Sequence, residues 1–215
     1  MSDTAKNIAQ NIQKIKSDIP SDTALIAVSK QQPLERIRAA LEAGHRDFGE
    51  NRIQDAQKIW PALKEEFPDI RLHFIGQLQS NKAEDAVTLF DVIHTVDRPK
   101  LAKALSDAMG KHSLKRPCLI QVNTGDEGQK GGIHVKELPK FLDQCRDTYN
   151  IDIAGLMCLP PQDEAAGLHF ALLQKLAKRH GLNELSMGMS ADYQTALKFG
   201  ATYIRVGSSL FGARE

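Results

Sequence analysis

Lys30 is the residue of this chain best placed to act as a nucleophile. It ends a strongly β-like run that begins at Ala24, and it stands just before a helix signal that begins at Pro33. An amine at a strand-to-helix junction lies at the mouth of an α/β fold, where a desolvated lysine can lose its proton and add to a carbonyl. The alternative is a lysine that only ends the strand and reaches into solvent, as most lysines do. The rest of the chain decides between the two.

Two further segments could hold a phosphate group. The run Gly207–Ser209 opens a turn before a short helix, and backbone N–H groups in such a turn form an anion cradle. Ser190 precedes another helix signal and has a hydroxyl that can donate to the same anion. The alternative is that Ser190 is only a helix N-cap and Gly207 only a turn residue. Together the two segments predict one phosphate site.

A nucleophilic lysine and a phosphate cradle on one face suggest a substrate or cofactor that carries both an aldehyde and a phosphate. Pyridoxal 5′-phosphate fits this description. Its aldehyde would condense with Lys30, its phosphate would lie at Ser190, Gly207 and Ser208, and Arg205 would point at its ring.

Other kinds of site have little support in the sequence. The glycine-rich segment Gly125–Gly132 lacks the ending of a phosphate-binding P-loop, so we interpret it as a flexible loop or a lid. The chain shows no Ser/His/Asp set and no pair of carboxylates at neighbouring strand ends. Its seven histidines include no HExxH or HxxxH pair, so we predict no metal site.

The elements that must position these residues alternate along the whole chain. An amphipathic helix at about Thr4–Ser17 comes first, and strands then take turns with helices. The expected strands are Ala24–Ser29, Arg46–Gly49, Arg71–Ile75, Asp91–Thr95, Cys118–Asn123, Ile153–Met157, Glu184–Met187 and Thr202–Val206. The expected helices are Pro33–Glu42, Arg52–Glu66, Asn81–Phe90, Arg98–Lys111, Val135–Tyr149, Glu164–Arg179 and Ala191–Phe199, with a short one after Ser208.

Eight strands in this order predict a single α/β domain over residues 1–215, folded as a (β/α)8 TIM barrel with an extra N-terminal helix. A doubly wound open sheet is the alternative, but its glycine-rich fingerprint after the first strand is missing. In a barrel of this kind the active face lies at the carboxyl ends of the strands. Lys30, Asn51, Ser190 and Gly207 all follow strand ends in this assignment.

Composition excludes several classes of protein. The 215 residues carry a net charge of +1 with no basic stripe, which argues against nucleic-acid binding. No apolar run approaches the roughly 20 residues that span a bilayer, and the polar N-terminus is no signal peptide. Three widely spaced cysteines, Cys118, Cys145 and Cys158, suggest idle thiols in a reducing compartment. We therefore expect a cytoplasmic protein.

The chain resembles the pyridoxal-phosphate homeostasis proteins, the YggS/PROSC family, which are single-domain relatives of the barrel half of alanine racemase. The match extends from the first strand to the C-terminus, and its third-strand motif is very specific. The motifs that carry it are Ala27–Lys30, Phe48–Asn51, His73–Lys82, Gly155–Met157, Leu185–Ser190 and Arg205–Gly212.

The resemblance implies a role for each predicted site residue. Lys30 would hold the cofactor as a Schiff base and Asn51 would lie beside it. Ser190 and the amides of Gly207 and Ser208 would hold the phosphate, as the residues alone already suggest. The chain departs from the family pattern at Gln194 and in the segment Gln162–Gly167, both away from the inferred cofactor contacts.

Arg205 would face the pyridine nitrogen, and this placement bears on catalysis. A permanent cation there disfavours protonation of the ring and weakens its capacity to take up electrons. Racemase chemistry also needs a second acid/base, which in the relatives comes from a further domain and a dimer partner. We therefore expect a monomeric, non-catalytic protein that buffers pyridoxal phosphate or delivers it to apo-enzymes that depend on it.

Two catalytic alternatives remain open. One is a racemase-like enzyme that uses pyridoxal phosphate, and the other is a Schiff-base aldolase that uses Lys30. An aldolase would need an acid/base near the lysine. Tyr149, Tyr193 and Tyr203 do not lie at strand ends that face it.

Overall fold

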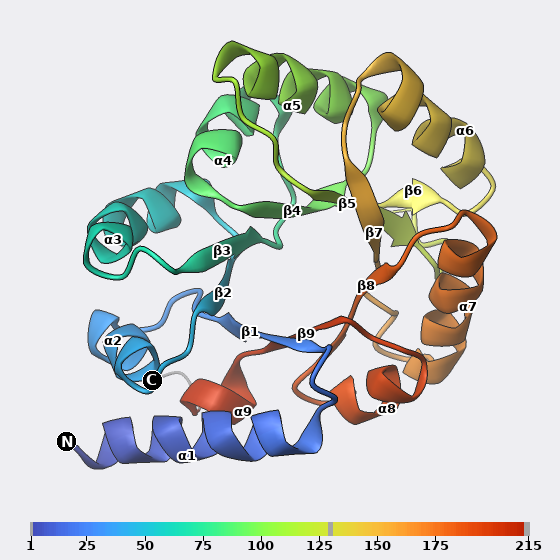
Figure 1. Cartoon of the computed structure of the whole chain (residues 1–215). Coiled ribbons are helices and arrows are strands. Elements are labelled where there is room, and N and C mark those ends of the chain that lie inside the picture. Colours follow the sequence, from blue (N-terminus) through green and yellow to red (C-terminus); the bar gives the residue numbers. More distant parts are fainter. Residues whose placement is uncertain (1, 129–130, 213–215) are drawn as a thin grey trace.

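The computed structural model describes residues 2–128 and 131–212 and shows a closed barrel of eight parallel strands (Figure 1). Neighbouring strands follow the order β4-β3-β2-β1-β9-β8-β7-β5, and a further pairing of β4 with β5 closes the ring. This closure rules out the open, doubly wound sheet and confirms the (β/α)8 barrel. The barrel strands are β1 (Ala24–Val28), β2 (Asp47–Glu50), β3 (Arg71–Phe74), β4 (Val92–Val96), β5 (Cys118–Asn123), β7 (Ile153–Met157), β8 (Glu184–Met189) and β9 (Tyr203–Val206).

Helices surround the barrel on its outer side, as Figure 1 shows. They are α1 (Asp3–Asp18), α2 (Leu34–Glu42), α3 (Ile53–Glu66), α4 (Ala83–Leu89), α5 (Pro99–Lys111), α6 (Leu138–Asp143), α7 (Ala166–Arg179), α8 (Tyr193–Lys198) and α9 (Ser208–Phe211). A 3₁₀ turn, η1 (Ser80–Lys82), precedes α4, and a π-helical segment, η2 (Gln144–Thr148), continues α6. Among the described residues, no helix is both long enough and apolar enough to span a bilayer.

Most predicted elements agree with the structure to within two residues, but the segment between β5 and β7 does not. The predicted helix Val135–Tyr149 begins three residues later, at Leu138, and widens to a π-helix at Gln144. A two-residue strand, β6 (Ile133–His134), pairs with β5 beside the barrel and was not predicted. Two residues of alternating pattern carry too little signal to distinguish a strand from a loop.

Two separate apolar cores stabilise the fold. The larger one fills the layer between strands and helices and contains large buried side chains such as Phe48, Trp60, Phe74, Phe90 and Phe170. The smaller one lies inside the barrel and is made of Ile26, Val92, Leu119, Met157 and Tyr203. Since side chains alternate along a strand, these five residues identify which positions of their strands point inward.

The N-terminal helix α1 packs across the outside of the barrel beside α2 and α9 (Figure 1). Its buried face is formed by Ile8, Ile12 and Ile15, spaced for one side of a helix. Its Asn11 also donates a hydrogen bond of 3.0 Å to the carbonyl of Leu210 in α9. The extra helix therefore supports the short helix that follows β9.

Candidate functional site

Lys30 follows β1 at the carboxyl end of the barrel and is half-buried. Ile26 belongs to the core inside the barrel, whereas Leu25 and Ala27 belong to the outer core. The alternation places Val28, the last residue of β1, on the inward side, and Lys30 follows two residues later in the turn. The backbone of Lys30 therefore stands just beyond the carboxyl end of β1. The next residue, Gln31, has a φ of 59° and turns the chain toward α2.

The strand register places Lys30 between two other predicted site residues. On one side Val28 pairs with Gly49 of β2, so Lys30 and Asn51 each stand two residues beyond that pair. On the other side Ala27 pairs with Val206 of β9, which is followed by Gly207. Asn51 and Gly207 therefore flank the lysine on the two neighbouring strands.

The backbone of Asn51 is held in place by a close contact with the loop after β3. A Cβ atom added to Gly76 would lie 2.1 Å from the carbonyl oxygen of Asn51 and 2.7 Å from its Cα. Only glycine allows these two loops to approach so closely. Sequence reasoning named Gly76 only as part of a motif and missed this packing role.

Behind Lys30, a buried carboxylate joins β1 to β2 and α3. Glu50 Oε1 accepts hydrogen bonds from the hydroxyl of Ser29 at 2.7 Å and from the indole of Trp60 at 3.3 Å. Burial raises the pKa of Glu50, and these two hydrogen bonds offset part of that effect. The three residues tie together the two strands that carry Lys30 and Asn51, a second feature that the sequence did not reveal.

The predicted phosphate cradle is assembled from two neighbouring loops. The backbone N–H of Gly207 donates to the hydroxyl of Ser190 at 3.3 Å, which brings the ends of β8 and β9 together. The N–H groups of Ser208 and Ser209 open α9, where a helix has no acceptor of its own for them. The alternative interpretation of Ser190 as an N-cap is wrong, because α8 begins at Tyr193 and is preceded by Asp192. Its hydroxyl is therefore not committed to a helix end.

Arg205 lies in β9, two residues before Gly207, and its side chain is buried inside the barrel. Its guanidinium donates to the hydroxyl of Ser186 at 2.6 Å and to the carbonyl of Cys158 at 2.9 Å. Burial lowers its pKa. In the described part of the chain, no carboxylate lies within ion-pair distance of it. Such a cation favours a ligand that offers it a negative charge or an acceptor lone pair.

Amide side chains from β5 hold the loop that follows this strand. Asn123 donates to the carbonyl of Glu127 at 2.9 Å, and Gln121 donates to the carbonyl of Gly131 at 2.9 Å. Gln121 and Asn123 both belong to the carboxyl-terminal half of β5. The role of the Gly125–Gly132 segment as a lid stays a prediction, and its residues 129 and 130 lie outside the described residues.

Metal and thiol chemistry have no support in the described ranges. Among residues 2–128 and 131–212, no group of three metal-ligating side chains comes together. Cys118, Cys145 and Cys158 are buried and unpaired. Burial raises the pKa of the Cys145 and Cys158 thiols to about 12, so neither is a nucleophile near neutral pH.

Comparison with known proteins identifies close relatives over the full length of the barrel. The family model for the N-terminal domain of alanine racemase matches residues 4–215. A curated protein of Pseudomonas aeruginosa named pyridoxal phosphate homeostasis protein is 38% identical, with 100% of this chain and 97% of that protein covered. The protein of the same name in Escherichia coli is 34% identical, with 100% and 98% covered.

Solved structures agree with these sequence relationships. The structure of PipY from Synechococcus elongatus with PLP bound is 38% identical, with a TM-score of 0.87, and covers 95% of this chain and 100% of that one. Alanine racemase of Clostridium difficile has a TM-score of 0.78 at 14% identity, and this chain spans 57% of its length. The second similarity shows a shared barrel fold.

Proposed function

The chain belongs to the pyridoxal phosphate homeostasis proteins, within the wider family of the alanine racemase N-terminal domain, and from this premise we propose that it binds pyridoxal 5′-phosphate through Lys30. The observation that carries the proposal is the position of Lys30 between Asn51 and Gly207 on adjacent strands. The relatives' names and the PLP-bound PipY structure support the same ligand.

The donors of the site fit the three chemical parts of this cofactor. Lys30 offers an amine to the aldehyde. The Ser190 hydroxyl and the amide of Ser208 offer donors to the phosphate, a group that open helix starts and turn amides favour, and the Gly207 amide donates to the Ser190 hydroxyl and holds it in place. Arg205 offers a cation to the ring nitrogen. One lysine, one anion cradle and one buried cation therefore match one aldehyde, one phosphate and one pyridine.

The cofactor supplies an electrophilic aldehyde carbon, and the remaining work belongs to this chain. Lys30 would supply the amine for that carbon, and one water would leave as the reversible covalent bond forms. Gly76 packs against the backbone of Asn51 and fixes its position two residues beyond the pair of Val28 with Gly49. Ser190, held by the Gly207 amide, and the Ser208 amide would orient the phosphate, and their binding energy would reduce the freedom of the aldehyde.

We further propose that the protein stores and releases pyridoxal phosphate and does not turn over amino acids. Arg205 cannot protonate a ring nitrogen, since its guanidinium keeps its proton, and its charge disfavours a cationic ring. The ring therefore gains little as an electron acceptor. We infer that the protein acts in the cytoplasm as a monomer and that apo-enzymes dependent on pyridoxal phosphate receive the cofactor.

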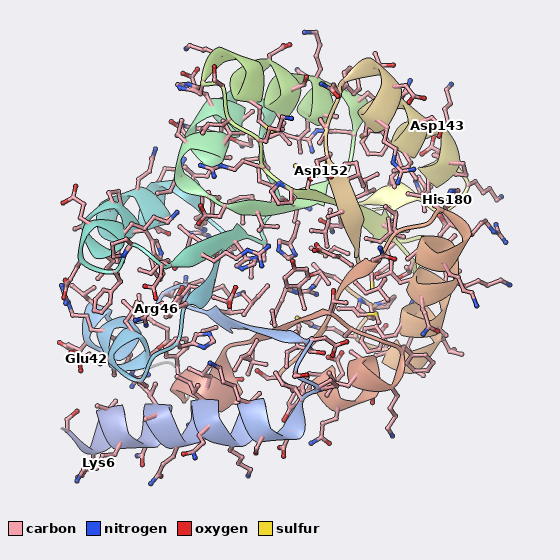
Figure 2. The ribbon with its side chains drawn as sticks, viewed as in Figure 1. Lys6, Glu42, Arg46, Asp143, Asp152 and His180 are labelled. Atoms are coloured by element: carbon pink, nitrogen blue, oxygen red, sulfur yellow. The ribbon has the colours of Figure 1, made fainter. Side chains whose placement is uncertain are left out.

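An absorption titration with pyridoxal phosphate tests binding through Lys30. We expect the wild type to develop a visible band that Lys30→Ala abolishes. Lys6→Ala is the matched control, because Lys6 is exposed on α1 and points away from the barrel in Figure 2. A Lys30→Ala variant with an unchanged band would contradict the proposal.

A further inference from the structure

Five polar side chains from five different strands form a continuous hydrogen-bonded chain through the inside of the barrel. From the amino-terminal end upward, Asp47 Oδ1 lies 3.0 Å from His73 Nε2, and His73 Nδ1 lies 2.9 Å from His94 Nε2. His94 Nδ1 lies 2.9 Å from Ser186 Oγ, which lies 2.6 Å from an Arg205 nitrogen. Figure 2 shows nitrogen and oxygen atoms among the side chains that the strands enclose.

With both imidazoles neutral, the Asp47 end of this chain determines the direction of every hydrogen bond in it. The Asp47 carboxylate can only accept, so His73 carries its proton on Nε2 and donates to it. His73 Nδ1 then accepts from His94 Nε2, and His94 Nδ1 accepts from the Ser186 hydroxyl. The Ser186 oxygen still has a lone pair for Arg205, which can only donate, so both ends of the chain are satisfied.

Both imidazoles must be neutral for this arrangement to exist, and their surroundings favour the neutral form. Burial lowers the pKa of His73 and lowers that of His94 much further. Arg71 acts on both rings in the same sense, Arg205 acts on His94, and Asp47 and Asp91 oppose the effect at His73. Burial therefore has a larger effect on the pKa values of both rings than the charged groups that face them.

Tyr203 holds the two rings in the orientations that the chain requires. Its ring packs edge-on against His73 at 5.7 Å and against His94 at 5.1 Å between centroids. Its own hydroxyl accepts from Arg71 at 3.3 Å. Rings packed in this way cannot rotate to exchange their two nitrogens without disturbing the inner core.

The chain stabilises a buried cation without placing a carboxylate on it. A carboxylate in contact with Arg205 would cancel most of its charge as seen from the barrel mouth. Here the nearest link is a hydroxyl, and the carboxylate of Asp47 stands beyond two neutral rings. Aligned donors and acceptors in a dry interior strengthen one another, so the guanidinium is held while its charge still acts on the mouth.

We propose that Ser186, His94, His73 and Asp47 are positioning residues that hold the Arg205 guanidinium in one orientation with its charge directed at the barrel mouth. The hydrogen-bond chain belongs to the cofactor-free protein. Its consequence for a bound ring rests on the proposed function. Ser186 belongs to the motif Leu185–Ser190. The sequence predicts a role only for Ser190 in this motif, and the hydrogen-bond chain gives one to Ser186.

Nitrogen NMR of the cofactor-free protein labelled with ¹⁵N-histidine tests the chain directly. We expect His73 and His94 to be neutral, each with its proton on Nε2, and to show a nitrogen–nitrogen coupling across the hydrogen bond from His94 Nε2 to His73 Nδ1. The half-exposed His134 is the control, because its ring protons exchange with water. A proton on Nδ1 of either buried ring, or a charged ring at neutral pH, would overturn the proposal.

Two variants distinguish the effect of losing a link in the hydrogen-bond chain from a general loss of stability. Ser186→Ala removes the donor to His94 Nδ1, so that resonance should shift, and pyridoxal phosphate should bind about tenfold more weakly while Lys30 still reacts. Asp47→Asn should keep both protons on Nε2, since an amide oxygen can replace the carboxylate as acceptor. An unchanged His94 signal together with unchanged cofactor affinity in Ser186→Ala would contradict the positioning role. If the wild type does not bind pyridoxal phosphate, the proposed function is contradicted. The NMR result on the cofactor-free protein still tests the hydrogen-bond chain in that case.

Discussion

Gly76 approaches Asn51 so closely that a Cβ atom on Gly76 would lie 2.1 Å from the Asn51 carbonyl oxygen. The contact joins the loop after β3 to the loop after β2. It also means that the position of Asn51, a predicted cofactor neighbour, depends on a residue outside the predicted cofactor contacts. Any side chain at position 76 must move the backbone of Asn51.

Gly76→Ala should therefore weaken both the fold and cofactor binding. We expect the free energy of unfolding to fall by about 1–3 kcal/mol, because the added methyl group meets backbone and no flexible side chain. Denaturant unfolding and a binding titration measure the two effects. Gly110→Ala is the control, since nothing lies within 4 Å of its added Cβ and Gly110 is in the helix α5. That change should stabilise the protein by up to about 1 kcal/mol. Equal effects of the two variants would contradict the packing role of Gly76.

Ser190→Ala should reduce cofactor retention without removing the reactive lysine. The Ser190 hydroxyl meets the Gly207 amide at 3.3 Å and is the side-chain donor of the proposed cradle. Loss of one hydrogen bond to a charged phosphate should cost about 1–2 kcal/mol of binding free energy. Equilibrium dialysis measures it, and inorganic phosphate should compete with the wild type. Ser17→Ala, at an exposed hydroxyl on α1, is the control. A Ser190→Ala protein that retains the cofactor as tightly as wild type would place the cradle elsewhere.

The barrel and the strand ends that precede the predicted site residues could be predicted from the sequence because both depend on local patterns. The continuous apolar run Ala24–Val28 before Lys30 indicates a buried strand, and parallel strands of a barrel bring their carboxyl ends to one face. A glycine just past a helical run indicates a left-handed helix end, and Gly44, Gly181 and Gly200 at such positions have φ values of 81°, 64° and 77°.

The remaining features depend on contacts between residues distant in sequence. The approach of Gly76 to Asn51 and the bonds of Glu50 to Ser29 and Trp60 require the register of neighbouring strands. The N-cap expected at Ser190 was wrong, because the loop bends to bring its hydroxyl to Gly207 and α8 begins three residues later. Local helix propensity cannot predict a hydrogen bond between two neighbouring loops that lie 17 residues apart in the sequence.

Stability should fall as the pH falls below about 6.5, because three buried histidines resist protonation. Burial lowers the pKa of His45 to about 4 and also lowers the pKa values of His73 and His94. Between these values and 6.5 the unfolded chain binds more protons than the folded protein, so acid favours unfolding. Each histidine contributes up to about 1.4 kcal/mol per pH unit.

Denaturant unfolding at pH 7.5, 6.5 and 5.5 measures this dependence. Glu50 acts in the opposite sense from pH 4.5 upward, since burial raises its pKa in the folded protein. His45→Gln isolates the contribution of His45 to the pH dependence. The glutamine amide can still donate to the Asp47 carbonyl oxygen, which lies 2.8 Å from His45 Nε2. The variant should show a shallower slope than wild type. Identical slopes for the two proteins would contradict the role of His45.

Turnover of amino acids should be negligible. Arg205 is buried and bonded to Ser186 and to the Cys158 carbonyl, so it can offer the ring nitrogen a cation but no proton. We expect the cofactor-loaded protein, incubated with L- or D-alanine in deuterated water, to leave the α-hydrogen unexchanged by NMR. Exchange at about one per second or faster, a rate ordinary for enzymes, would restore the racemase-like alternative.

The central claim is that Lys30 is the residue that bonds covalently to pyridoxal phosphate. Borohydride reduction of the cofactor-loaded protein, followed by peptide mass analysis, makes the bond permanent and identifies the lysine. The position of Lys30 between Asn51 and Gly207 predicts a label on the peptide that contains Lys30, and its loss in Lys30→Ala. A label on another lysine, with Lys30 unmodified, would contradict the account.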